Sequence, residues 1–244
     1  MIKKNSISFG KSPLRLFYFV YPLYFRLIQV PRENHAVIRL LFKARVPKGM
    51  RVTFDFTSLV LRRALKKYKP AAGSALDIGT GMGAVLANYL RSISSLKIDG
   101  VDLVVERVKS SQTVCDYNRS GARIWQSDLF QNVEGKYDLV FHNAAYMPAG
   151  LIKDVLSGIG RADDKFWDGG EDIASIISRF FRQAAEHLNP GGTALLGVNN
   201  FYVPDEKILD LIKAGPLTLI DRVTMPFNPS SVYVLRAKEK ADGK

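Results

Sequence analysis

The chain has 244 residues, of which 47% are hydrophobic and 24% charged, enough to bury the core of one large domain or of a domain with an extension. Its formal net charge is +12, which points to acidic partners. The single cysteine, Cys115, excludes an internal disulfide, and no signal peptide is recognisable, so we expect a cytoplasmic protein.

The basic excess lies in the first third of the chain. Residues 1–75 contain 16 lysines and arginines but only two acids, Glu33 and Asp55, a net charge of +14, whereas the rest of the chain carries −2. A basic face favours a polyanion such as RNA or the ribosome, DNA, or an anionic membrane surface, although a solvated surface would give the same composition.

An aromatic stretch at residues 13–30 lies within this basic region. Arg15, Arg26 and Pro22 interrupt it, so it is too short to span a bilayer. It could lie on a membrane surface, stack on bases, or pack against the main domain. We therefore predict a basic, aromatic extension over residues 1–55 and a main domain over residues 56–240.

The remaining elements follow in chain order. Residues 35–56 are expected to form two strands around a Pro-Lys-Gly turn, and residues 57–70 a helix that ends at Pro70. Strands and helices then alternate, which predicts a mostly parallel, seven-stranded α/β sheet with helices on both faces. The predicted strands are 74–78, 97–103, 122–126, 137–142, 193–199, 217–223 and 231–237, and the predicted helices are 83–93, 104–118, 171–188 and 204–215.

A glycine-rich turn, "DIGTGMGAV" at residues 77–85, follows the first strand of this alternating part. Ligands of open parallel sheets bind at the carboxyl ends of the strands, where this turn lies. Gly79, Gly81 and Ala84 satisfy a dinucleotide pattern. Asp77, Gly79, Gly81 and Gly83 satisfy a pattern of S-adenosylmethionine methyltransferases, and the turn alone does not choose between them.

Acidic residues near the turn favour the second cofactor. Asp77 would repel a pyrophosphate but suits the ammonium group at the methionine end of S-adenosylmethionine. Asp102 closes the second strand and can accept from ribose hydroxyls in either ligand. Asp128 follows the third strand and can accept from an adenine amino group, while the backbone N–H of Leu129 reaches a ring nitrogen; Asp128 could instead cap a turn.

Together these motifs resemble the class I methyltransferases of the HemK-like group, which includes release-factor glutamine methyltransferases, and the neighbouring small-domain rRNA guanine methyltransferases. The resemblance covers residues 55–238 and rests on "LDIGTGMGAV", "GVDL", "YN" at 117–118, "SDLF", "YDLVFHNAAYMP" and "DGGEDI". It implies a Rossmann-like class I methyltransferase domain, S-adenosyl-L-methionine as cofactor, no metal site, and a protein or RNA acceptor.

The stretch "NAAYMP" at residues 143–148 stands where the resemblance places a catalytic Asn-Pro-Pro-Tyr. An Asn oxygen and the next carbonyl can accept the two N–H bonds of a planar amine, and an aromatic ring packs against its face. The resemblance therefore implies that Asn143 and Tyr146 are catalytic, with Asn143 also close to the cofactor. Ala144 and Ala145 replace the two prolines, which predicts a softer loop.

Other interpretations stay open at this point. His142 could be a base or a buried, hydrogen-bonded histidine, and Cys115 is expected in the core. The preferred function is N-methylation of an amide or exocyclic amine in a protein or RNA. The alternatives are a small-molecule methyltransferase, a degenerate methyltransferase fold that binds RNA or a partner, and a nicotinamide oxidoreductase.

Overall fold

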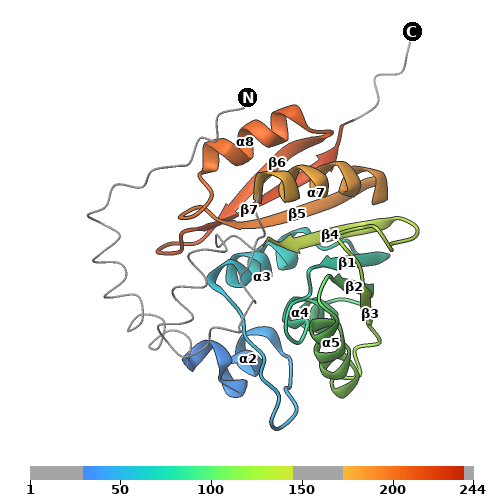
Figure 1. The fold of residues 1–244 in the computed structure, drawn as a ribbon, viewed down its shortest axis with the longest axis vertical. Helices are drawn as coiled ribbons and strands as arrows, with labels where there is room; N and C mark the ends of the chain where they lie inside the picture. Colours follow the sequence, from blue (N-terminus) through green and yellow to red (C-terminus); the bar gives the residue numbers. More distant parts are fainter. Residues whose placement is uncertain (1–29, 145–172, 239–244) are drawn as a thin grey trace, which may run out of the picture.

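The computed structural model describes residues 30–144 and 173–238, and they form a seven-stranded sheet covered by helices on both faces (Figure 1). The strand order is β3-β2-β1-β4-β5-β7-β6, and β7 is the strand that runs antiparallel to its neighbours. The strands are β1 Ser74–Ile78, β2 Lys97–Asp102, β3 Arg123–Gln126, β4 Tyr137–Asn143, β5 Leu188–Asn199, β6 Leu217–Thr224 and β7 Ser230–Ala237. The expected mostly parallel sheet is confirmed.

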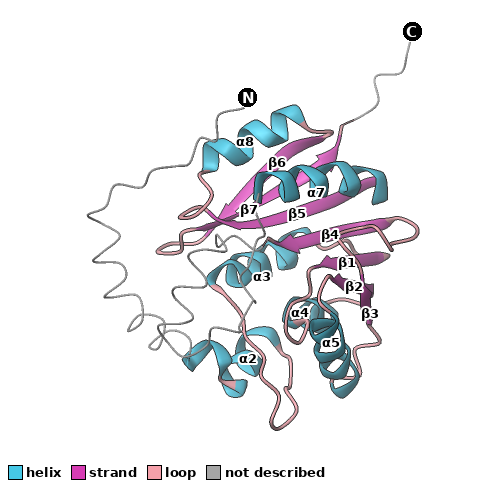
Figure 2. Ribbon diagram, in the orientation of Figure 1, coloured by secondary structure: helices cyan, strands magenta, loops and turns pink. Residues whose placement is uncertain are grey.

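Two apolar cores lie on the two faces of the sheet, and helices cover both faces (Figure 2). Alternate residues along β4 enter opposite cores: Leu139 and Phe141 join one, and Val140 the other, as the two-residue period of a strand requires. The helices α7 Ile173–His187 and α8 Asp205–Ala214 cover one face. The other face is covered by α2 His35–Phe42, α3 Phe56–Tyr68, α4 Val85–Ile93 and α5 Val105–Tyr117.

The two strands expected over residues 35–56 are wrong, because His35–Phe42 is a helix. Asn34 caps it by accepting hydrogen bonds from the backbone N–H groups of Ala36 (2.9 Å) and Val37 (3.2 Å). Ile38 and Phe42, one helical turn apart, are fully buried. The expected turn after it is confirmed by a hydrogen bond from Met50 N to Pro47 O (3.2 Å).

Residues 30–55 pack on the sheet with α3 and α4. Phe42 and Phe54 rings lie 5.0 Å apart in the same core as α3. The side-chain amide of Asn118, at the end of α5, accepts from Arg45 N (2.8 Å) and donates to Arg45 O (2.7 Å), so it pairs with both backbone groups of Arg45. This described part of the predicted extension therefore contributes to the core. The aromatic stretch at residues 13–29 lies outside the described residues.

Two further observations concern the chemical character of the fold. Cys115 is buried in the core, as expected, and burial raises the pKa of its thiol to about 11. Among the described helices, none has the length and apolarity that crossing a bilayer requires.

Candidate active site

The glycine turn lies between β1 and α4, at the carboxyl edge of the sheet. Gly79, Gly81 and Gly83 have φ angles of +74°, +64° and +91°, a region that L side chains rarely adopt. A Cβ at Gly83 would lie 2.7 Å from a methyl group of Val52, so only glycine fits there. A Cβ at Gly81 would meet nothing within 4 Å, so the turn presents an open face on which a ligand could rest.

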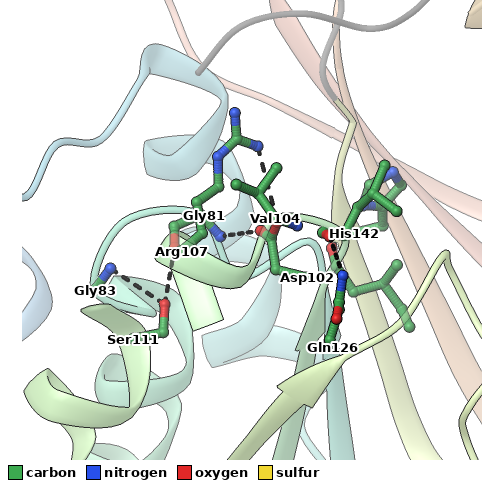
Figure 3. Close-up of polar contacts among 10 residues, drawn as sticks. Gly81, Gly83, Asp102, Val104, Arg107, Ser111, Gln126 and His142 are labelled. Atoms are coloured by element: carbon green, nitrogen blue, oxygen red, sulfur yellow. Dashed lines mark hydrogen bonds and ion pairs between the residues drawn. The ribbon is translucent and has the colours of Figure 1, made fainter. Parts of the chain in front are cut away.

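Asp102, at the end of β2, is hydrogen-bonded to this turn (Figure 3). One carboxylate oxygen accepts from Gly81 N (2.9 Å) and the other from Val104 N (2.9 Å). Arg107, on α5, places a guanidinium nitrogen 3.9 Å from the same carboxylate. Asp102 is only 3% exposed, so its orientation is fixed by these three partners.

A serine from α5 braces the other side of the turn. The Ser111 hydroxyl accepts from Gly83 N (3.2 Å) and donates to Gly81 O (2.8 Å), as Figure 3 shows. Asp102 and Ser111 therefore fix the backbone of Gly81 from two directions.

Asp77 lies inside β1 just before the turn and is 2% exposed. Burial, together with the negative charge of Asp102, raises the pKa of the Asp77 carboxyl well above its usual value. A positive group placed nearby would oppose this shift and favour the ionised form.

Asp128 and Leu129 follow β3, as the sequence predicted. The Asp128 carboxylate pairs with Arg179 of α7 at 2.6 Å, and its side chain is 39% exposed. Leu129 has a φ of +50° and is almost fully buried. Asp128 is thus engaged by a cation that the sequence did not predict, while part of its carboxylate still faces solvent.

Asn143 is the last residue of β4, beside the glycine turn, because Ile78 and His142 are paired in the β1–β4 ladder. Its side-chain nitrogen donates to an Asp55 oxygen (3.0 Å) and to the Ser58 hydroxyl (3.2 Å), both at the start of α3. Its side-chain oxygen is buried and has no hydrogen-bond partner among the described residues. The site therefore contains one fixed, unused amide acceptor.

The first residue after Asn143, Ala144, is held by a backbone hydrogen bond and so is not part of the soft loop that the sequence predicted. Ala144 is 1% exposed, and its N–H donates to Gly197 O of β5 (3.1 Å). A proline at this position could not make that bond, so alanine here extends the pairing of β4 with β5 by one residue. Tyr146, Ala145 and the acidic element at 168–172 lie outside the described residues.

His142 points to the opposite face of the sheet from Asn143, towards Phe180, whose ring centre lies 5.2 Å away. Its Nδ1 is 2.6 Å from Ile78 O, and because a carbonyl only accepts, Nδ1 carries the proton. Burial lowers the pKa of His142 to about 4. The interpretation of His142 as a buried, hydrogen-bonded histidine is confirmed.

Several residues of this site were not predicted from the sequence: Asp55, Ser58, Arg107, Ser111 and Arg179. Apart from Arg107, which lies five positions after Asp102, they act through partners distant in sequence: Asp55 and Asn143, for example, are 88 positions apart.

The order of strands and helices is that of the class I methyltransferase fold. Residues 50–148 match the family model of the methyltransferase small domain. This match covers less than half of the chain, so the chain is similar to this family and, through its relatives, to the HemK-like group of S-adenosylmethionine-dependent class I methyltransferases.

The chain is also similar to several named methyltransferases. The chain is 29% identical over 153 residues to a Methanocaldococcus jannaschii protein named as a protein N5-glutamine methyltransferase, covering 62% of this chain and 75% of that protein. It is 28% identical over 142 residues to ribosomal RNA small subunit methyltransferase C of Pasteurella multocida, covering 58% of this chain but 37% of that protein.

Among solved structures, the 16S rRNA N2 G1207 methyltransferase of Thermus thermophilus, in complex with AdoMet and guanosine, superposes with a TM-score of 0.54. The match covers 75% of this chain and 44% of that chain. At 18% identity, this likeness concerns the fold.

Proposed function

We propose that the protein transfers a methyl group from S-adenosyl-L-methionine to a planar NH2 group, either a glutamine amide in a protein or an exocyclic base amine in RNA. The observation that carries this proposal is the side-chain oxygen of Asn143, which is buried, unpaired among the described residues, and held beside the glycine turn. A buried acceptor without a donor is costly, so a ligand N–H is its natural complement.

The cofactor is proposed to lie across the carboxyl ends of β1, β2 and β3. The open face at Gly81 admits it, and the Asp102 carboxylate retains lone pairs for ribose hydroxyls. The ammonium of the methionine end would favour the ionised form of Asp77. The residues proposed to contact it are Asp77, Gly79, Gly81, Gly83, Asp102, Asp128, Leu129 and Asn143.

When bound, the cofactor supplies an electrophilic methyl group on a sulfonium. The protein's contribution is then to orient the acceptor nitrogen and to stabilise the charge that it develops. The oxygen of Asn143 and the carbonyl of Ala144 would accept the two N–H bonds of the acceptor. Tyr146 is proposed to pack against the face of the same planar group.

Two classes of acceptor fit this chemistry, and the relatives carry names of both kinds. The basic amino-terminal region, residues 1–75, is proposed to bring the protein to RNA or to the ribosome in the cytoplasm. Its support is a group of exposed cations on and beside α2 and α3: Arg39, Lys43, Arg45, Lys48, Arg63, Lys66 and Lys67. The division into residues 1–55 and 56–240 remains a proposal.

The decisive experiment is transfer of labelled methyl from S-adenosylmethionine in a cell lysate, followed by separation into protein, RNA and small-molecule fractions. We expect the wild-type protein to label the protein or the RNA fraction, and Asn143→Ala to label neither. Label in the small-molecule fraction alone would contradict the proposed acceptor. No label, together with no thermal shift on adding S-adenosylhomocysteine, would instead indicate a non-catalytic binding protein.

The polyanion proposal has its own test. Binding of RNA should weaken steeply as salt rises, because each phosphate contact releases counterions. A triple replacement, Arg39→Gln with Lys43→Gln and Lys48→Gln, should make the salt dependence shallower. The matched control removes an equal number of cations from the far edge of the sheet: Lys207→Gln, Lys213→Gln and Arg236→Gln. Equal effects of the two sets, or no binding, would contradict the proposal.

A further inference from the structure

The amide group of Asn143 has two ends, and the structure shows which of them is available. Its nitrogen is 3.0 Å from a carboxylate oxygen of Asp55 and 3.2 Å from the Ser58 hydroxyl. A carboxylate only accepts, so the end that faces Asp55 must be the NH2 end. The oxygen therefore points away from α3, where no described residue donates to it.

Asp55 is itself held firmly, and this makes it an effective anchor. It is the N-cap of α3, and one of its oxygens accepts from Ser58 N (2.7 Å) and from the Ser58 hydroxyl (2.6 Å). The Ser58 hydroxyl in turn accepts from Asp55 N (3.3 Å), which completes a capping box. Asp55 and Ser58 are 2% and 3% exposed, so water does not compete for these contacts.

The anchor has a consequence for the amide. The last torsion of an asparagine side chain is broad, so the two ends of an unanchored amide exchange readily. Turned by half a circle, the Asn143 oxygen would face the carboxylate of Asp55, two acceptors in contact within a buried site. Asp55 therefore excludes the flipped orientation, in which the Asn143 amide could only donate a hydrogen bond to the methyl acceptor.

We propose that Asp55, supported by Ser58, is a positioning residue for the acceptor: it keeps the oxygen of Asn143 directed at the incoming amine. Hydrogen bonds in series also polarise one another, so donation from the amide to a carboxylate makes the amide oxygen a stronger acceptor. This inference rests on the proposed function of Asn143. It selects for an acceptor that carries N–H donors and against a hydroxyl that has only one.

The test separates the cap from the anchor. Asp55→Ser retains an N-cap oxygen, but one bond closer to the backbone, so it caps α3 without reaching Asn143 as closely. We expect turnover in labelled methyl transfer to fall about tenfold, with the Kd for S-adenosylhomocysteine unchanged within about twofold. Asp55→Asn keeps both the cap of α3 and an oxygen that can accept from the Asn143 amide, so it should retain most of the wild-type turnover.

Two controls make the result specific. Asn34→Ser alters the N-cap of α2, away from Asn143, and should leave turnover unchanged. In an Asn143→Ala background, Asp55→Ser should cause no further loss, because the residue through which it acts is gone. Full turnover of Asp55→Ser, or an additive loss in the double variant, would overturn the proposal.

A measurement without any acceptor distinguishes this inference from the proposed function. In the NMR spectrum of wild-type protein, the side-chain amide protons of Asn143, assigned by their absence in Asn143→Ala, should be shifted and slow to exchange. Asp55→Ser should abolish both signatures. If they are present but no nitrogen acceptor is methylated, the positioning stands and the proposed function fails. If they are absent in the wild type, the positioning itself is wrong.

Discussion

Asp102 has a structural task and a proposed binding task, and substitution should reveal both. Its carboxylate is 3% exposed and accepts from Gly81 N and Val104 N, so Asp102→Ala leaves two partly buried donors without an acceptor. At about 1–3 kcal/mol for each, the free energy of unfolding should fall by at least about 2 kcal/mol, and Tm by roughly 4–8 °C. Asp102→Asn keeps one oxygen and should lose about half as much.

The cofactor affinity of the same variants should fall for a separate reason. Loss of a charge-assisted hydrogen bond to the ribose weakens binding by about 1–3 kcal/mol, a Kd increase of roughly 5- to 150-fold. Calorimetric titration with S-adenosylhomocysteine, well below Tm, measures this directly.

The control for Asp102→Ala is Asp138→Ala, near the opposite end of β4, where the carboxylate accepts from Ser74 N and from the Asn189 amide, each at 2.8 Å. That change should lower stability but leave Kd unaltered. An unchanged Kd in Asp102→Ala, or equal changes in the two variants, would refute the placement of the ribose.

Four further predictions concern residues 142–146. Asn143→Ala should keep the affinity for S-adenosylhomocysteine but lower turnover by roughly 10²-fold. Tyr146→Ala should raise the apparent KM of the acceptor more than it lowers turnover. Kinetics of methyl transfer with the labelled acceptor fraction measures both effects. Ala144→Pro removes the donor to Gly197 O, so thermal unfolding should show a loss of about 1 kcal/mol, and unchanged stability would mean that this bond contributes nothing. His142 has a pKa of about 4 in the folded protein and 6.5 in the unfolded chain, so between these pH values the unfolded chain binds more protons. The free energy of unfolding should therefore fall by about 3 kcal/mol as the pH drops from 6.5 to 4, and His142→Gln should flatten this pH dependence. Asp77, whose raised pKa acts with the opposite sign, is present in both the wild type and the variant.

The sheet and its glycine turn could be predicted because their signals are local. Each strand is a short apolar run, and the turn after β1 needs glycine at the alternate positions 79, 81 and 83, where φ is positive. Helix α2 was not predictable in the same way. Its β-branched and aromatic residues favour a strand locally, and the helix is decided by the Asn34 cap and by burial of Ile38 and Phe42 on one face.

The residue types of the candidate site could be predicted, but not the partners that orient them. Asn143 was identified by its place at the end of a strand, yet nothing in the sequence indicates that Asp55, 88 residues earlier, holds its amide. Likewise, the substitution of proline by Ala144 predicted a softer loop, whereas the free N–H is used to extend a strand pair. Such contacts depend on which helix the fold places over which strand end.

The serine that braces the glycine turn has a consequence for how the cofactor binds. Because Ser111 holds Gly81 and Gly83 through contacts made within the protein itself, the turn need not be ordered when the ligand arrives. Association should then be a single step whose rate rises linearly with ligand concentration. The amide proton of Gly83 should exchange slowly with solvent before any ligand is added, and Ser111→Ala should speed that exchange while also making association slower and biphasic.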